Sequence, residues 1–206
     1  MIKGKFPKCI IKNSIETLID HENNRCYKIS FRMSRKGKSN ILVIGRAPKR
    51  LDENCISKSI QRIIKYLNNK KELLGNIGKV TIVNLFTAYE YSRETLSDLF
   101  LEKGERFITG NDERYKENNF VIKNDEIIKD EIENADNIIL AWGESLKEID
   151  ILYNNRVEYI LKTIRQCDIE SNYNKKICIV GDLTKKGYPR HCMSWMIKDE
   201  LLDYKR

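Results

Sequence analysis

Four short runs of apolar, β-prone residues constrain the fold of this chain more than any other feature of its sequence. They span residues 41–44 (ILVI), 80–83 (VTIV), 138–141 (IILA) and 177–180 (ICIV), and each one ends in small or polar residues. Unbroken apolar runs of this length are typical of strands that are buried on both faces. A sheet built from them therefore needs a covering layer on each side.

Helical patterns lie between the four runs. Apolar residues recur at helical spacing over residues 57–74, 125–134 and 146–167. Strand and helix alternating three times predict right-handed crossovers and a parallel sheet between helices. We therefore expect an α/β three-layer sandwich around a four-stranded parallel core sheet.

The remaining segments are expected to extend this core. Residues 27–33 alternate apolar and polar side chains and precede a Lys36-Gly37-Lys38 turn, which predicts an antiparallel edge hairpin with the first core strand. Residues 1–25 are interpreted as an N-terminal extension. Residues 89–123 follow neither period and are interpreted as a helical start followed by an excursion or lid.

Length and composition narrow the class of protein. A chain of 206 residues, 41% hydrophobic and 33% charged, predicts a single globular domain, residues 1–206. About 18 consecutive apolar residues would be needed to span a membrane, and no such run or signal-peptide pattern occurs, so we expect a cytoplasmic protein without a membrane partner. Six cysteines without a C-x-x-C spacing predict reduced thiols and neither a metal nor a cofactor.

The charge balance indicates the kind of partner. The formal net charge is +8, and the Lys and Arg residues concentrate near residues 32–38, 46–50 and 185–190, whereas residues 94–136 are rich in acids. One basic face is typical of proteins that bind a polyanion, although surplus lysine also keeps proteins soluble. We expect a nucleic acid, with DNA favoured, or a nucleotide.

Ligands of open α/β sheets bind beyond the carboxyl ends of the strands, so the loops that follow the four runs are the candidate site. In the first loop, Gly45 and Pro48 bracket a sharp exit, and Arg46 offers donors to a ligand. Gly45 would let a ligand approach the backbone closely, with a mere tight turn as the alternative. Lys49 and Arg50 could hold phosphates and Asp52 could position a water, although charged loop residues are often only solvated.

The next two loops offer groups that could recognise a base. Asn84 carries a donor and an acceptor side by side, which matches a base edge, and Phe86 could stack on a base. A capping role for Asn84 and a core position for Phe86 remain alternatives. Trp142 and Gly143 follow the third run and are included as substrate-binding candidates.

The fourth loop contains a histidine, His191, that could act on a leaving group near neutral pH; a structural role is its alternative. Asp182 is a further acid candidate. The same loop offers substrate-binding or phosphate-binding groups in Thr184, Arg190, Lys185 and Lys186. Signatures of P-loop, dinucleotide-binding, serine hydrolase and zincin proteins are absent from the chain.

Several of these segments resemble one family in the same order. The segments CYKISFRMS, APKRLDENCISKSIQR, VNLF, KNDEI, AWG and LTKKGYPRH are similar to the family catalogued as domain of unknown function 1643, over residues 26–191. That family commonly has Asn-Pro-Ser where this chain has Ala47, Pro48 and Lys49. This resemblance carries no activity with it.

A more distant resemblance concerns the uracil-DNA glycosylase superfamily, which implies a four-stranded parallel sheet with functional motifs at the strand ends. Residues 45–48 (GRAP) resemble its first motif, Asn84 follows the second strand as a base-reading asparagine can, and residues 189–191 occupy the place of its histidine loop. Two departures stand out. Ala47 replaces the water-positioning acid or amide, and Pro-Arg-His replaces His-Pro-Ser, so Asp52, Asn84 or Asp182 would have to hold the water.

Three functions follow as hypotheses. The first is a nucleic-acid-acting N-glycosylase-like protein that recognises a flipped, possibly modified base. The second is a non-catalytic module that binds nucleic acid or a nucleotide, which the Ala47 departure favours. The third is a hydrolase or transferase that acts on free nucleosides or nucleotides in the same pocket.

Overall fold

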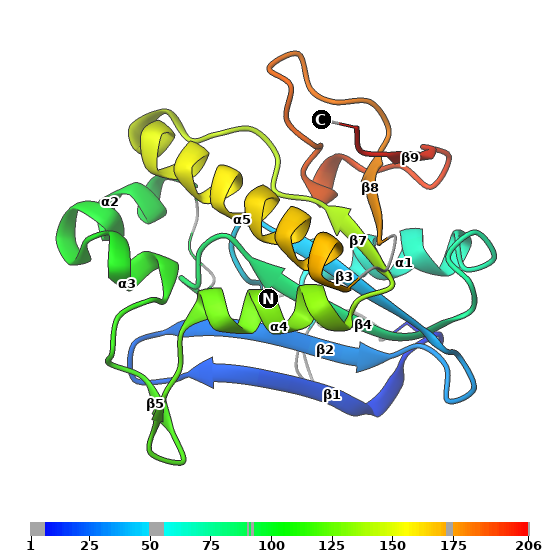
Figure 1. Ribbon diagram of the computed structural model, residues 1–206, viewed down its shortest axis with the longest axis horizontal. Coiled ribbons are helices and arrows are strands. Elements are labelled where there is room, and N and C mark those ends of the chain that lie inside the picture. The colour runs from blue at the N-terminus through cyan, green and yellow to red at the C-terminus, as the bar shows by residue number, and fades with distance from the viewer. Residues whose placement is uncertain (1–6, 50–55, 90, 92, 172–174, 206) are drawn as a thin grey trace.

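The computed structural model describes residues 7–49, 56–89, 91, 93–171 and 175–205. Seven strands of this described part form one mixed sheet in the order β1-β2-β4-β3-β7-β8-β9 (Figure 1). Its centre is parallel: β4 (Ile77–Asn84), β3 (Ser39–Gly45), β7 (Asn137–Leu140) and β8 (Lys176–Val180) are consecutive parallel neighbours. These are the four apolar runs of the sequence, so the α/β class is confirmed.

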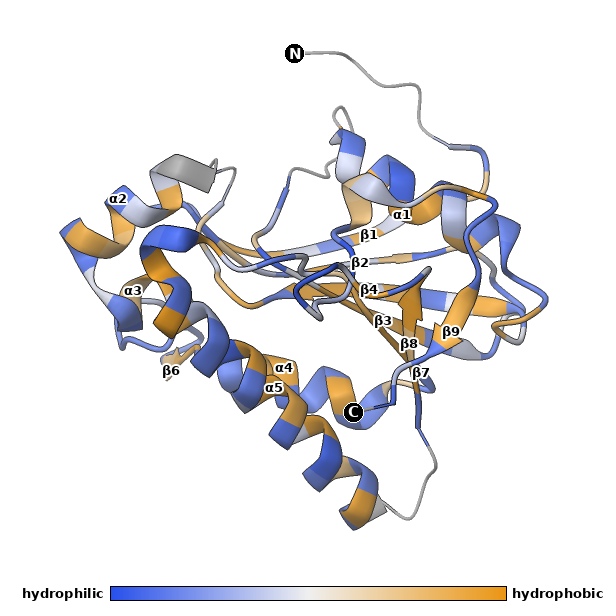
Figure 2. Cartoon of the chain, turned by 90° about the horizontal axis from the view of Figure 1, so that it is seen from above, coloured by the Kyte–Doolittle hydropathy of each residue, from blue (hydrophilic) through white to orange (hydrophobic). Residues whose placement is uncertain are grey.

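Helices cover both faces of the sheet (Figure 2). On one face α1 (Lys58–Asn69) buries Ile60, Ile63, Ile64 and Leu67 against the strands. On the other face lie α4 (Asn124–Asn134) and α5 (Asp150–Ser171), which is preceded by the short 3-10 helix η1 (Lys147–Ile149). The sheet thus separates two apolar cores, which explains why its central strands lack an alternating pattern.

Local signals set the helix boundaries near the expected positions. The Ser57 hydroxyl accepts a hydrogen bond from the Ile60 amide at 3.4 Å and caps α1, as serine does at helix starts. Asp125 and Glu126 lie in the first turn of α4, where carboxylates interact favourably with the helix dipole.

The predicted hairpin is wrong in its partner. β2 (Arg25–Arg32) pairs with β4 and not with β3, because the chain crosses the start of β4 before it enters β3. Gly37 and Gly78 make this crossing possible, since a Cβ on either one would collide with the backbone of the other. The connection is therefore a close crossing of backbones rather than a tight turn.

The actual hairpin partner of β2 lies in the segment interpreted as an extension. β1 (Ile11–Asp20) pairs with β2 in antiparallel register and forms one edge of the sheet. The other edge is β9 (Leu201–Asp203), antiparallel to β8. Antiparallel strands thus flank the parallel centre on both sides.

The segment at residues 89–123 is more regular than the sequence suggested. It holds α2 (Arg93–Lys103), α3 (Glu105–Thr109) and a small ribbon of β5 (Lys116–Glu117) and β6 (Phe120–Val121). Leu96, Phe107 and Ile108 are buried in the core on the α5 face. Its described residues therefore form part of the packed structure rather than an open loop.

No helix in the described residues has both the length and the apolar character to cross a membrane.

Candidate functional site

The strand order places a crevice between the ends of β3 and β7. The chain leaves β3 toward α1 on one face and leaves β7 toward α5 on the other, so the two loops diverge at this point. Such a reversal point is where open α/β sheets bind ligands. The loop after β8, which contains the 3-10 helix η2 (Cys192–Ser194), closes the third side.

A small cavity of about 30 Å³ lies at this crevice. Six candidates from three different loops line it, namely Gly45, Arg46, Pro48, Lys49, Asn84 and His191. Its floor is apolar and comes from β2, α1 and the strand ends: Ile29, Ile60, Ile63, Ile82 and Ala141. Residues that are more than a hundred positions apart in sequence are thus gathered at one place.

Arg46 bridges the first and third loops. Its Nε donates to the carbonyl oxygen of Trp142 at 3.1 Å, and its Nη2 donates to that of Glu144 at 3.0 Å. Backbone carbonyls orient the guanidinium without neutralising it. No ion pair joins Arg46 to an acid among the described residues, so its charge is available to an anion.

Gly143 lets the histidine loop approach the end of β7. Its φ is +76°, and a Cβ there would stand 2.7 Å from the Cβ of His191 and 2.9 Å from Nη2 of Arg46. Glycine is the residue that adopts this conformation without strain and leaves this space empty. Gly143 therefore lets Arg46 and His191 approach each other, and it does not itself line the cavity.

His191 is held as a neutral imidazole. Burial, reinforced by the charges of Arg46 and Lys49, lowers its pKa from 6.5 to about 4. The amide of Met193 donates to Nδ1 at 3.2 Å, so the proton of the neutral ring resides on Nε2. The ring therefore offers an N–H donor at neutral pH rather than a transferable positive charge.

Asn84 is 4% exposed and its amide lies across Gly45. A Cβ on Gly45 would stand 2.5 Å from the Asn84 Oδ1, so the space beside Gly45 is taken by this amide. The sequence interpretation, in which Gly45 leaves room for a ligand, is corrected accordingly. The main-chain carbonyl oxygen of Asn84 accepts a hydrogen bond from the Asn124 Nδ2 at 3.1 Å, which ties the end of β4 to the start of α4.

Two cations, Arg46 and Lys49, line the cavity. Lys49 lines it and donates from Nζ to the Tyr91 carbonyl oxygen at 2.6 Å. No Asp or Glu occurs among the described residues that line it. Two predicted groups, Arg50 and Asp52, lie outside the described residues, and Asp182 is exposed and does not line the cavity.

Two predicted aromatic groups are core residues. Phe86 and Trp142 are fully buried on the α5 face, opposite the cavity, and Phe86 packs against Tyr153 with ring centroids 6.0 Å apart. Stacking of Phe86 on a base is therefore excluded in this arrangement. Only the carbonyl oxygen of Trp142 takes part in the site, as the acceptor for Arg46.

Three other predicted residues of the fourth loop lie away from the cavity. Thr184 accepts hydrogen bonds at Oγ1 and O from its own loop, and Arg190 pairs with Asp199 at 3.7 Å while lying against Gly181. Lys185 is exposed. None of these three residues lines the cavity, so a substrate-contacting role for them is not supported by their position.

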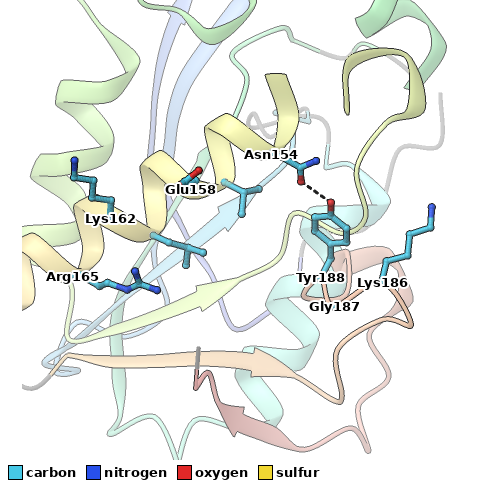
Figure 3. Close-up of a pocket in the computed structure, with 9 residues that line it drawn as sticks. Asn154, Glu158, Lys162, Arg165, Lys186, Gly187 and Tyr188 are labelled. Carbon is cyan, nitrogen blue, oxygen red and sulfur yellow. Dashed lines mark hydrogen bonds between the residues drawn. The ribbon is translucent and has the colours of Figure 1, made fainter. Parts of the chain in front are cut away.

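Lys186 lines a different hollow, on the α5 face of the sheet. This hollow measures about 520 Å³ and is built from α5 and residues 186–188 (Figure 3). There the Tyr188 hydroxyl donates to the Asn154 Oδ1 at 2.6 Å and fastens the loop to the helix. The basic residues of the fourth loop therefore do not converge on the candidate site.

Two residues of the site were not identified from the sequence. The Tyr153 hydroxyl hydrogen-bonds the carbonyl oxygens of Trp142 and Gly143 at 3.0 and 2.9 Å and so supports the loop that holds Arg46. Cys192 lines the cavity, but burial raises the pKa of its thiol to about 12, so it remains protonated. A helical tyrosine and a buried cysteine carry no sequence signal of such positions.

Comparison with known proteins identifies a family but no characterised relative. No curated protein and no solved structure matches this chain. A family model described as protein of unknown function (DUF1643) matches residues 30–193, which include the ends of all four parallel strands and the loop of His191. The chain therefore belongs to the DUF1643 family.

Proposed function

We propose that this protein acts on nucleic acid as an N-glycosylase that recognises one flipped, possibly modified base at the cavity beyond β3 and β7. The observation that carries the proposal is the combination of two cations, Arg46 and Lys49, with the neutral His191 and the buried amide of Asn84 around one cavity. Cations suit a phosphate, and an amide suits a base edge.

The proposed reaction is hydrolysis of the bond between the base and C1′ of the sugar. Water adds its oxygen to C1′, the base leaves with the electron pair of the broken bond, and the proton released by the water ends on the base. The N–H of neutral His191 would donate a hydrogen bond to the departing base. A fixed donor aimed at developing charge is commonly the largest catalytic contribution in such sites.

The size of the cavity sets a condition on this proposal. About 30 Å³ holds a water or two, whereas ligand pockets measure roughly 300–1,000 Å³. A base therefore enters only if the loops that line the cavity move apart. Unstacking a base also costs a few kcal/mol, which favours bases that are damaged or already unpaired.

A specific observation favours a second candidate, recognition of a base without cleavage. Hydrolysis needs a group that orients the attacking water, and no carboxylate occurs among the described residues that line the cavity. Asp52 is the first acid in the sequence after Lys49, and it lies outside the described residues. Its substitution therefore separates the two candidates.

The decisive experiment incubates the protein with a panel of natural and modified DNAs and measures abasic sites by strand cleavage in alkali. Release of one base by the wild-type protein, abolished in D52N and retained in the matched control D182N, supports the enzyme. Tight binding without release from any DNA supports recognition alone. Release from free nucleosides but from no DNA would contradict both candidates.

Three variants assign roles within the site. Asn84→Ala should weaken discrimination between bases, by about 1–3 kcal/mol, more than overall affinity. Arg46→Ala should weaken affinity for all sequences alike. His191→Gln should lower turnover with little change in binding, because a donor to the leaving base acts mainly in the transition state.

A further inference from the structure

A groove larger than the cavity lies beside it, along the exposed side of α1. This groove measures about 810 Å³ and is bounded by α1 and residues 193–198. None of the residues proposed from the sequence as site residues lines it. It is therefore a separate feature of the same face.

The lining of the groove is strongly basic. Five cations take part, and no Asp or Glu occurs among the lining residues that the structure describes; the cations are Lys58, Arg62, Lys65, Lys70 and Lys198. Three of those on α1 follow one another at intervals of four and three residues, so they rise by about 6 and about 4.5 Å along the helix. Residues at these intervals share one side of a helix, so the three cations form a row along it.

The opposite wall of the groove is apolar. Met193, Met196 and Ile197 are 40%, 48% and 54% exposed and line the groove in sequence order. Beneath them Trp195 is buried against Tyr66, with ring centroids 5.3 Å apart. A rigid base thus supports a row of exposed apolar side chains opposite a row of cations.

The groove adjoins the candidate site, because α1 and the loop of His191 contribute residues to both. Met193 lies two residues after His191, and its amide donates to the Nδ1 of that histidine. Arg62 donates to the carbonyl oxygens of Met193 and Trp195, which fastens this wall to α1. The buried side of α1, through Ile60 and Ile63, lines the cavity itself.

We propose that this groove holds a single-stranded segment of nucleic acid and leads it to the His191 loop. The cations of α1 contact successive phosphates, and Met193, Met196 and Ile197 contact the faces of the bases. Cations along a groove with apolar surfaces for bases are the features by which proteins bind single strands. The choice of nucleic acid as the ligand rests on the proposed function, whereas the binding surface is inferred from the residues that line the groove.

The test compares two triple charge reversals with the same change of net charge. The groove variant is K58E/K65E/K198E, and the matched control is R35E/K36E/K38E, on the exposed connection between β2 and β3. Binding of a fluorescent single-stranded oligonucleotide is measured at several salt concentrations. The groove variant should lose about tenfold or more in affinity, and its slope of log affinity against log salt should fall by about 2, while the control stays close to wild type.

A second variant, M196S/I197S, tests the apolar wall. It should lower affinity by about tenfold while leaving the salt slope unchanged, because it removes apolar contact and no charge. Equal losses in both triple variants, or no loss in the groove variant, would overturn the proposal. So would wild-type protein that binds vesicles of anionic phospholipid but no oligonucleotide at low salt.

Base release is scored separately on the same proteins. Wild-type protein that binds the strand through the groove but releases no base leaves this inference standing and contradicts only the glycosylase. Release of a base with undiminished strand affinity in the groove variant contradicts only the groove.

Discussion

Two arginines in this fold have opposite surroundings. Arg25, at the start of β2, is fully buried and contacts Asp20 at 2.8 Å and Asp112 at 2.6 Å, with Phe107 beneath its guanidinium. Arg46, at the end of β3, is partly buried and contacts backbone carbonyl oxygens. One cation is neutralised by carboxylates, and the other is only oriented.

This difference indicates what each region does. The Arg25 cluster joins the turn between β1 and β2 to residues near α3, and two carboxylates neutralise its cation within the protein. In the Arg46 site no carboxylate neutralises Arg46 among the described residues, and its charge adds to burial in lowering the pKa of His191. Buried paired charges serve the fold, whereas an oriented and unneutralised cation suits an anionic ligand.

The largest expected effect is on the paired arginine. Arg25→Met should lower the free energy of unfolding by about 3–5 kcal/mol, because it leaves Asp20 and Asp112 without their cation. Urea denaturation measures this loss. Replacing all three residues, in D20L/R25M/D112L, should recover much of the lost stability. A triple variant less stable than R25M would contradict the inference that the two carboxylates left without a cation cause the loss.

The next effect concerns pH and the His191 site. The pKa of His191 is about 4 in the folded chain and 6.5 ordinarily, so its stabilising contribution is complete above pH 6.5 and disappears as the pH falls toward 4. The loss should reach at most about 3 kcal/mol. Urea denaturation between pH 7 and 4 should show a flatter profile in His191→Gln; identical profiles would contradict the neutral, buried histidine.

The Asp20 carboxyl titrates in a different window. Burial raises its pKa, but hydrogen bonds from Arg25 and Asn23 outweigh burial and hold it below 3.8. Its contribution is therefore present above pH 3.8 and disappears only below it. The two regions should thus lose stability over separate pH ranges, which allows them to be distinguished in one titration.

A smaller effect is expected for the glycine that brings the loops together. Gly143→Ala should cost about 2 kcal/mol through its positive φ and should also displace His191. Gly187 is a matched control, because its φ is +79° and nothing stands within 4 Å of its Cβ position. Thermal unfolding and ligand affinity should fall together in G143A, and equal behaviour of G187A would contradict the close approach.

The smallest effect on stability is expected for Arg46. Arg46→Met should cost about 1 kcal/mol, since it removes hydrogen bonds to carbonyl oxygens and leaves no carboxylate buried. The same variant should lose affinity for oligonucleotides. A stability loss as large as that of R25M would erase the distinction between the two arginines.

The sequence by itself determined the elements whose signals are local. Unbroken apolar runs marked the four parallel strands, helical spacing marked α1, α4 and α5, and Ser57 marked the start of α1. The closeness of Arg46, Asn84 and His191 also followed from sequence, because the ends of parallel strands meet at one edge of a sheet.

Only the tertiary structure decided which strands pair and which face each side chain takes. β2 pairs with β1 on one side and with β4 on the other, and Gly37 and Gly78, 41 positions apart, allow the chain to cross the start of β4 on its way to β3. Phe86 and Trp142 turned into the core, away from the cavity. Arg25 met Asp112 across 87 positions, and the groove formed from α1 and residues 193–198. Such contacts depend on packing between distant segments, which no local pattern encodes.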